Sequence, residues 1–597
     1  MARITAWAGA VLCACAPLMA PVAQANSAAE YFMGRAGRTA VPRLLSEDER
    51  AYYKDLFAAI KRADWTRVQS MFAAKPTGPL HQVALAEYYL APTSPKIDLE
   101  ALNAWLNAGT SLPQSEQITA LAAKRGALAL PALPQAQALV TLPTTPRRTR
   151  PRSIADGTMP ATVAAAINDR IKADDVLGAR TLLDGIDNLL SAEARAEWRQ
   201  KVAWAHYIVN QDADAYTLAL TAAQGGGVPV AGPWVAEAWW TAGLAAWRIG
   251  DCQKAVEAFG GATQASNPEL VAAAHYWQSR AMVRCRQPES AAAPLRAAAR
   301  LDETLYGMLA AEQLGLRLPA THATPDFTQG DWQALRDNGN VRAAVALAEI
   351  GEDALADEVL RHQARIGTPG QYQMLTRLAR DLGLPATQLW MAYNAPPGGS
   401  PAPAIRFPTP KWTPVNGWQV DPALVFAHTL QESAFRATVV SPAGARGLMQ
   451  IMPAAARDHA PTIGVAGTAG DLTRPEINLA FGQQHLNTLR TAPATQGLLI
   501  KVMAAYNAGL APVGRWNTQI RDGGDPLLWM ESVPYWETRG YVAIVMRNYW
   551  MYERQAGGSS NSRSALAQGM WPTFPGLEGS RGVRVAANGQ LAGTAGF

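Results

Sequence analysis

Cysteine is scarce in this sequence, and so is charge of either sign. The 597 residues include four cysteines, and charged residues make up 17% of the chain, with a formal net charge of +5. So small a positive charge is compatible with an anionic partner but does not require one. No basic stripe with interleaved aromatic residues is present, which argues against a nucleic-acid-binding protein. The eight histidines are scattered along the chain, so we expect neither a metal site nor a cofactor.

Long apolar runs are also missing, except at the N-terminus. There Arg3 precedes an apolar run from residue 4 to about residue 20, and the letters AQA at 23–25 supply the small-residue pattern of a cleavage site. These features predict a cleaved signal peptide over 1–25 and export to the periplasm. A retained anchor, or a lipoprotein modified in the stretch LCAC at 12–15, is a weaker alternative. No other run approaches the ~18 apolar residues of a membrane-spanning helix.

The rest of the chain is rich in alanine, which favours helix over sheet. Hydrophobic residues make up 49% of the sequence, and the length fits about four domains of ~150 residues. Trp204, Trp240 and Trp277 recur at spacings of 36 and 37 residues, each before a turn-like cluster and a second alanine-rich run. Helix pairs that repeat at such a period indicate a solenoid. We therefore predict a mainly all-α protein.

Breaks rich in proline and glycine divide the chain into units. We predict an α-superhelical domain over 26–320, a small helical linker domain over 321–405 and a compact third unit over 406–556. Within the first unit, residues 130–160 are rich in Pro, Thr and Arg and read as a loop or crossing linker. The Gly- and Ser-rich residues 557–597 are predicted to be a flexible tail.

Cys252 and Cys285 are the two cysteines that remain after removal of the signal peptide. Cys252 opens one predicted helix of the solenoid, and Cys285 closes the next. Antiparallel packing of these neighbouring helices would place the two ends side by side. Because an exported protein can form disulfides, we favour a Cys252–Cys285 bond over two buried free thiols.

The stretch HTLQESAFRATVVSPAGARGLMQIMP at 428–453 contains a single acidic residue, Glu432. Asp421 can cap the helix that carries it, and Pro422 suits the first turn. Glu432 then lies near the helix C-terminus among partly apolar neighbours. Burial and the negative end of the helix dipole would both raise its pKa, as a general acid near neutral pH requires. The alternative is a surface ion pair with Arg436, four residues on.

A Pro/Gly turn follows this helix. Gly444 and Gly447 permit unusual dihedral angles and close backbone approach. Gln450 offers the paired donor and acceptor that suit an acetamido sugar, and Met452 offers a soft apolar wall. The alternative is a tight turn with core methionines.

Two later blocks carry further polar candidates. In AAYNAG a helix should end near Asn507, and Tyr506 could hydrogen-bond across to a carboxyl group. In PYWETRGYV, Glu537 could bind a ligand or only favour the start of a helix.

The three blocks QESAFRATVVSPAGARGLMQIMP, AAYNAG and PYWETRGYV together resemble the soluble lytic transglycosylase family in order and spacing. The segment ETLYGMLAAEQLGL at 303–316 resembles the family's boundary segment. Members of this family have a ring-shaped or U-shaped superhelix of helix pairs, a small linker domain and a goose-lysozyme-like catalytic domain, and they cleave peptidoglycan. The resemblance implies this architecture here, with the catalytic domain over 406–556. It is weak over 26–160 and absent from the tail.

The resemblance makes Glu432 the sole catalytic acid/base. It gives substrate-binding or orienting roles to Ser433, Gln450, Met452, Tyr506, Asn507 and Glu537. Phe435 stands where the family often has tryptophan.

The implied chemistry needs one carboxyl group because the substrate supplies the second group. Glu432 would protonate the β-1,4 glycosidic oxygen between N-acetylmuramic acid and N-acetylglucosamine, and the muramic N-acetyl oxygen would stabilise C1. The ionised Glu432 would then deprotonate the C6 hydroxyl, which attacks C1 and leaves a 1,6-anhydro ring. No acidic residue occurs from 433 to 457, in agreement with this scheme. The resemblance implies an exotransglycosylase of cell-wall turnover, although the residues themselves leave exo and endo cleavage open.

Two other functions compete with this one. A hydrolase of the same bond, using water, could have an identical carboxyl arrangement. A catalytically silent glycan-binding scaffold is the second, and the solenoid makes partner binding credible. Loss of Glu432 or Tyr506 would mark such a scaffold, and both are present. The expected partners are peptidoglycan strands, with proteins of a cell-wall synthesis complex and association with the outer membrane or wall left open.

Overall fold

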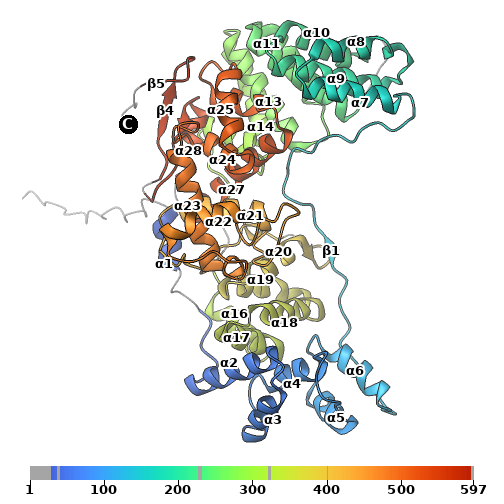
Figure 1. Cartoon of the computed structure of the whole chain (residues 1–597), viewed down its shortest axis with the longest axis vertical. Helices are drawn as coiled ribbons and strands as arrows, with labels where there is room; N and C mark the ends of the chain where they lie inside the picture. Colours follow the sequence, from blue (N-terminus) through green and yellow to red (C-terminus); the bar gives the residue numbers. More distant parts are fainter. Residues whose placement is uncertain are drawn as a thin grey trace, which may run out of the picture.

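The chain is described here from a computed structural model that covers residues 28–35, 40–225, 231–319, 325–399, 401–557, 559–577 and 579–592. It is an elongated, mainly α-helical molecule (Figure 1), so the predicted fold class is confirmed. No helix in these ranges is long and apolar enough to cross a membrane. The predicted signal peptide at 1–25 lies outside the described residues.

One end of the molecule is built from the first helices of the chain (Figure 1). Ser46 and Glu49 form a capping box at the first of them, because each side chain bonds the other residue's backbone N–H. The helices of this end are α2 (Glu47–Lys61), α3 (Trp65–Ala74), α4 (His81–Leu90), α5 (Leu99–Ala108) and α6 (Ser115–Lys124). The short α1 (Ala28–Arg35) lies elsewhere, with Phe32 edge-on to Phe426 of the third unit at 5.6 Å between ring centroids.

An extended segment from about residue 127 to residue 160 joins the two ends of the molecule and contains no helix (Figure 1). Its one strand, β1 (Val140–Thr141), pairs antiparallel with β2 (Asn394–Ala395). Gln137 donates its backbone N–H to the Arg365 carbonyl at 2.7 Å. The linker predicted at 130–160 therefore exists as a strap bound along the molecule.

The opposite end is the predicted solenoid. Each helix packs on the next, and Trp240 and Trp277 are buried in edge-to-face contact at 6.4 Å between centroids. The elements are α7 (Ala161–Lys172), α8 (Val176–Asp184), η1 (Asp187–Leu189), α9 (Ala192–Ile208), α10 (Asp212–Ala223), α11 (Pro233–Ile249), α12 (Cys252–Ala262), α13 (Pro268–Arg284), α14 (Pro288–Ala299) and α15 (Leu305–Gln313).

The predicted disulfide is confirmed. Cys252 at the start of α12 and Cys285 just after α13 are bonded, with 5.4 Å between their Cα atoms. The antiparallel packing of α12 and α13 brings these ends together, as the sequence argument required.

A second helical group packs on the N-terminal helices. It comprises α16 (Gln329–Leu335), α17 (Gly339–Ile350), α18 (Asp353–Ile366), η4 (Pro369–Gln371), α19 (Tyr372–Asp381) and α20 (Pro385–Tyr393). Its buried side chains form one core with those of 41–122. The Glu349 carboxylate accepts the backbone N–H groups of Leu44 and Leu45 at 2.5 and 3.1 Å. The division of the chain at residues 320 and 405 stays a prediction.

The third unit lies between the two ends (Figure 1). Its long helix α27 packs against α21 and α24 around a core of buried aliphatic and aromatic side chains. The elements are η5 (Pro403–Arg406), α21 (Pro422–Ser433), α22 (Pro453–Ile463), η6 (Asp471–Thr473), α23 (Pro475–Thr491), α24 (Leu499–Ala508), α25 (Leu510–Gln519), α26 (Pro526–Ser532) and α27 (Trp536–Gln555).

The prediction of a flexible tail after residue 556 is wrong for the described residues 559–577 and 579–592. They form α28 (Asn561–Ala567) and a three-stranded antiparallel sheet of β3 (Trp571–Pro572), β4 (Gly582–Val585) and β5 (Leu591–Ala592). Trp571 is fully buried, and its indole N–H donates to the Gly524 carbonyl at 2.8 Å. The prediction was wrong because it rested on the glycine and serine content, whereas a few large apolar residues of this segment complete the core of the third unit.

Candidate active site

Glu432 lies in the last turn of α21. Asp421 caps this helix by accepting the Ala423 N–H at 2.9 Å, and Pro422 occupies the first turn, as predicted. The helix ends because Ala434 and Phe435 adopt positive φ angles of 50° and 60°. Burial raises the pKa of Glu432 to about 7. The carboxyl group is therefore poised to exchange a proton near neutral pH.

Tyr541 is the direct partner of this carboxyl group. It stands on α27, and its hydroxyl donates to Glu432 Oε1 at 2.6 Å. Tyr541 is not among the residues predicted for the site, although it lies in the block PYWETRGYV. The hydrogen bond favours the ionised carboxylate and so lowers the Glu432 pKa, in opposition to burial.

His428 completes a three-residue chain. It lies one turn before Glu432 on α21, is fully buried, and its Nδ1 is 2.8 Å from the Tyr541 hydroxyl. Burial lowers the pKa of His428 to about 3, so the ring is neutral. Because the tyrosine proton goes to Glu432, we assign the histidine proton to Nδ1 from the hydrogen-bond network. The other ring nitrogen, Nε2, has no partner in the described part of the chain.

Tyr506 lies beside this chain but does not bond the carboxyl group as the sequence suggested. Its hydroxyl donates to the Met449 carbonyl at 2.7 Å. Its ring is parallel to that of Tyr541 at 6.4 Å and lies 4.7 Å from the His428 ring. The charge of Glu432 contributes to the raised pKa of Tyr506, after burial. Tyr506 thus forms a wall of the site and anchors the turn after α21.

Gln450 and Met452 lie in that turn and directly after it. Gly447 requires its glycine, because its φ is 75° and a Cβ would meet Asn478 Nδ2 and the Leu472 carbonyl at 2.2 Å. Gln450 adopts a φ of 47° and donates its amide to the Gly447 carbonyl at 2.9 Å. Met452 is 42% exposed.

The three remaining predicted residues have different surroundings. The Ser433 hydroxyl donates to the Thr429 carbonyl at 3.2 Å, within α21 and away from the Glu432 carboxyl. Asn507 Oδ1 accepts from the Thr538 hydroxyl at 2.7 Å, which ties α24 to α27. Glu537 is exposed, and its charge contributes to the raised pKa of Glu432.

The arrangement contains one titratable acid with two tyrosines and a neutral histidine around it. Of the acidic groups in the described ranges, only Glu537 acts on the Glu432 pKa through its charge. No group of three or more His, Cys, Asp or Glu residues in those ranges could hold a metal ion. Proton transfer through Glu432 is the chemistry that these groups support.

Comparison with known proteins agrees with this description. Residues 414–526 match the family described as "Transglycosylase SLT domain". The soluble lytic murein transglycosylase of Escherichia coli K12 is 33% identical over 156 residues, which cover 26% of this chain and 24% of that protein. A putative soluble lytic murein transglycosylase of Haemophilus influenzae is 36% identical over 274 residues, which cover 42% of each chain. The chain thus matches less than half the length of these relatives.

The crystal structure of the 70 kDa soluble lytic transglycosylase of Escherichia coli has a similar fold. Its TM-score is 0.52 at 17% identity, and the match covers 86% of this chain and 98% of that one. The likeness supports a shared helical superhelix architecture over most of the molecule.

Proposed function

We propose, on the premise that residues 414–526 form a transglycosylase SLT domain, that this chain is a peptidoglycan lytic transglycosylase. It would cleave the β-1,4 bond between N-acetylmuramic acid and N-acetylglucosamine without water and leave 1,6-anhydromuramic acid ends. The observation that carries the proposal is the single half-buried carboxyl of Glu432, with a pKa of about 7 and a hydrogen bond from Tyr541.

The pKa of Glu432 suits both halves of such a reaction. The protonated carboxyl donates its proton to the glycosidic oxygen as the bond to C1 breaks, and the carboxylate that remains accepts a proton from the C6 hydroxyl as that oxygen bonds to C1. A group with a pKa near the working pH can give and take a proton with little energetic bias. The attacking hydroxyl belongs to the same sugar, so its effective concentration is high.

Tyr541 and His428 hold the carboxyl group ready for this exchange. The Tyr541 hydroxyl stabilises the carboxylate that forms after the first proton transfer, and the neutral His428 ring fixes the direction of that hydroxyl. Because His428 keeps a pKa of about 3, it stays uncharged throughout and does not compete for the proton.

The other predicted residues would bind sugar around Glu432. The Gln450 amide nitrogen is bonded within the turn, so its oxygen would be the atom that contacts sugar, and Met452 offers an exposed thioether. Tyr506 supplies an aromatic wall, while Asn507 and Glu537 lie at the junction of α24 and α27. Ser433 contributes through the backbone of α21, because its hydroxyl is used within the helix.

A periplasmic location, after removal of the segment 1–25, follows from the same proposal, because intact peptidoglycan lies there. Strands of this polymer are the expected partner. The solenoid offers a long surface on which a strand, or proteins that build the wall, could dock.

The test is digestion of purified peptidoglycan by the mature protein and by its Glu432→Gln variant, with products identified by mass spectrometry. We expect anhydromuropeptides from the wild type and none from the variant. Reducing-end products would show a hydrolase that admits water. No product from either protein would favour a glycan-binding scaffold.

A further inference from the structure

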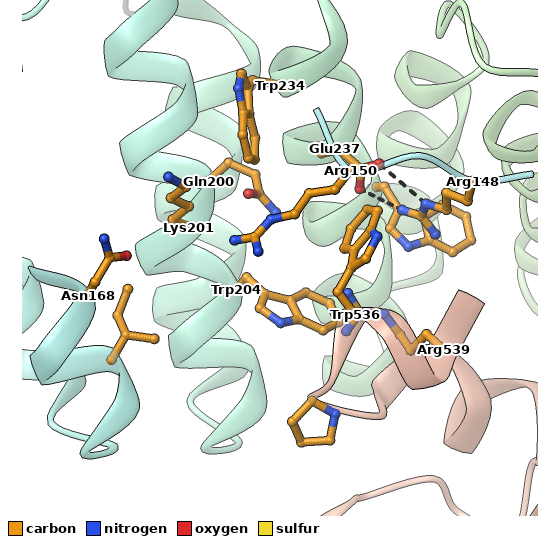
Figure 2. A pocket seen from close by; sticks show the side chains of 13 residues that line it. Arg148, Arg150, Asn168, Gln200, Lys201, Trp204, Trp234, Glu237, Trp536 and Arg539 are labelled. Carbon is orange, nitrogen blue, oxygen red and sulfur yellow. Dashed lines mark hydrogen bonds and ion pairs between the residues drawn. The ribbon is translucent and has the colours of Figure 1, made fainter. Parts of the chain in front are cut away.

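A pocket of about 230 Å³ lies where the solenoid meets the third unit (Figure 2). We call it the junction pocket. Helices α9 and α11 form one wall, Pro534 and the start of α27 form another, and the strap covers it from above. None of the seven residues predicted for catalysis or substrate binding lines it, so it is distinct from the candidate active site.

The walls of the junction pocket are strongly aromatic. Trp204, Trp234 and Trp240 come from the solenoid, and Trp536 comes from α27. Trp204 and Trp536 are only partly buried. The Arg539 guanidinium lies over one face of each ring, at 4.2 and 5.1 Å from the centroids, so a ligand would contact the part of each ring that Arg539 leaves exposed. Broad indole faces suit the apolar C–H face of a sugar ring, and a few polar groups among them would fix its orientation.

Four cations line the same space, and two of them lack an acidic partner. Arg148 bonds Glu237 at 2.6 Å and Glu531 at 3.3 Å, and Lys201 bonds Glu197 at 2.5 Å. These two charges are neutralised within the protein.

Arg150 and Arg539 are different. Arg150 extends from the strap toward Gln200 and Lys201 (Figure 2) and forms no hydrogen bond or ion pair with any described residue. Arg539 donates one N–H to the Val533 carbonyl at 2.6 Å and lies 4.2 Å from the centroid of Trp204, but it has no acidic partner within the described ranges. Burial is the main cause that lowers the pKa of Arg539 to about 10, so it is still charged at neutral pH. Glu531 and Glu237 act on Arg539 through their charges without forming an ion pair with it. A guanidinium group that has no ion pair is suited to a carboxylate ligand.

Helix α27 separates the junction pocket from Glu432. Trp536 and Arg539 are three residues apart and share one face, whereas Tyr541 reaches Glu432 from another face of the helix. A helix with its side chains is about 10–12 Å across, so one sugar could not occupy both sites. A longer strand could occupy both.

We propose that the junction pocket binds a carboxylate-bearing part of the peptidoglycan strand, with a ring on Trp204 and Trp536 and its carboxylate on Arg150 and Arg539. This inference rests on the proposed function, since it names a second contact for the same polymer. A muramic acid residue with its peptide combines a sugar ring with carboxylates, which is the combination that the pocket fits.

The test uses the full chain with Glu432→Gln, so that the probe is not consumed. The probe is a soluble disaccharide tetrapeptide released from peptidoglycan, titrated by calorimetry. We expect two molecules bound per chain. Adding Arg150→Ala should weaken one of the two binding events about tenfold, because a charged hydrogen-bonded pair contributes about 1.5 kcal/mol or more. Arg150 is exposed and makes no bond to the fold, so this change should leave folding intact.

Arg152→Ala is the matched control, because it removes the same charge two residues along the strap from a residue that does not line the pocket. It should leave both binding events unchanged. A chito-oligosaccharide, which has no carboxylate, should bind at one site only. Equal affinities in the Arg150→Ala and Arg152→Ala proteins, or two sites for the neutral oligosaccharide, would overturn the proposal. Cleavage of peptidoglycan by the wild-type protein is measured separately. If the junction pocket does not bind the probe, the proposed catalytic activity is therefore still tested independently.

Discussion

The Tyr541 hydroxyl and the Glu432 carboxyl are joined by a 2.6 Å hydrogen bond although 109 residues separate them in the chain. Tyr541 also contacts His428 Nδ1 at 2.8 Å. The bond therefore connects α27 to two successive turns of α21. It is the contact that holds the proposed acid in place, and several expectations depend on it.

Replacing Tyr541 by phenylalanine should slow cleavage by about ten- to a hundredfold, because a hydrogen bond to a charged group contributes about 1.5–3 kcal/mol. The loss should appear mainly in kcat, since the bond strengthens when the carboxylate forms. Tyr506→Phe is the comparison, because that hydroxyl bonds the Met449 carbonyl instead. It should alter KM more than kcat. Equal loss of kcat in both variants would contradict the assigned roles.

The rate of anhydromuropeptide release should fall as the pH rises through about 7, where protonated Glu432 is lost. The decline should approach tenfold per pH unit for a single essential acid. In the Tyr541→Phe protein this decrease in rate should occur at higher pH, because the hydrogen bond that lowers the Glu432 pKa is gone. A decrease that stays at the same pH would show that another group controls the rate.

Glu432→Gln should stabilise the folded protein at pH 8 but not at pH 4. Burial raises the Glu432 pKa from 4.5 to about 7, so the folded state binds a proton that the unfolded state releases between these values. Folding stability therefore decreases as the pH rises across this window, by up to about 3 kcal/mol. Melting temperatures at the two pH values measure the effect. An equal change in melting temperature at both pH values would contradict this account.

Removal of the disulfide should destabilise the solenoid. The bond closes a sequence separation of 33 residues, and chain entropy alone predicts a loss of about 3–4 kcal/mol in a Cys252→Ala, Cys285→Ala protein. The melting temperature of the solenoid should decrease, and a reducing agent should produce the same decrease in the wild type but none in the double variant. A melting curve unaffected by either treatment would contradict this account.

Trp571→Ala should destabilise the third unit by about 3–5 kcal/mol, as expected when a fully buried tryptophan is truncated. The variant also loses the hydrogen bond to Gly524. Leu577→Ala is the control, because that side chain is exposed. Denaturant titration followed by tryptophan fluorescence would compare the two. If both variants were as stable as the wild type, the C-terminal segment would be dispensable for folding.

The sequence predicted local features well because local features have local causes. The cap at Asp421 and the position of Glu432 in the last turn depend on residues within one helix, and the disulfide depends on two consecutive helices. Partners across the fold were harder to predict. Tyr506 and Tyr541 both face the site, and only the packing of α27 on α21 determines which hydroxyl reaches the carboxyl group.

The C-terminal segment was predicted to be flexible, and this prediction was wrong for its described residues. Its many glycines and serines suggested disorder, yet Trp571 and Phe574 are buried and a small sheet forms around them. The average composition of a segment does not show whether its few large apolar side chains are needed to complete the core of a neighbouring unit. Here Gly524 is covered by this segment, since a Cβ on Gly524 would meet the Val585 carbonyl at 2.2 Å.

The core shared by 41–122 and 327–395 determines when the first helices can fold during synthesis of the chain. The helices at the start of the chain cannot cover their apolar faces until residue 395 has left the ribosome. Until then, Leu44 and Leu45 have no Glu349 to accept their N–H groups. Contacts between such distant residues slow folding. The apolar faces of the first helices therefore stay exposed on the nascent chain until the second helical group has been made.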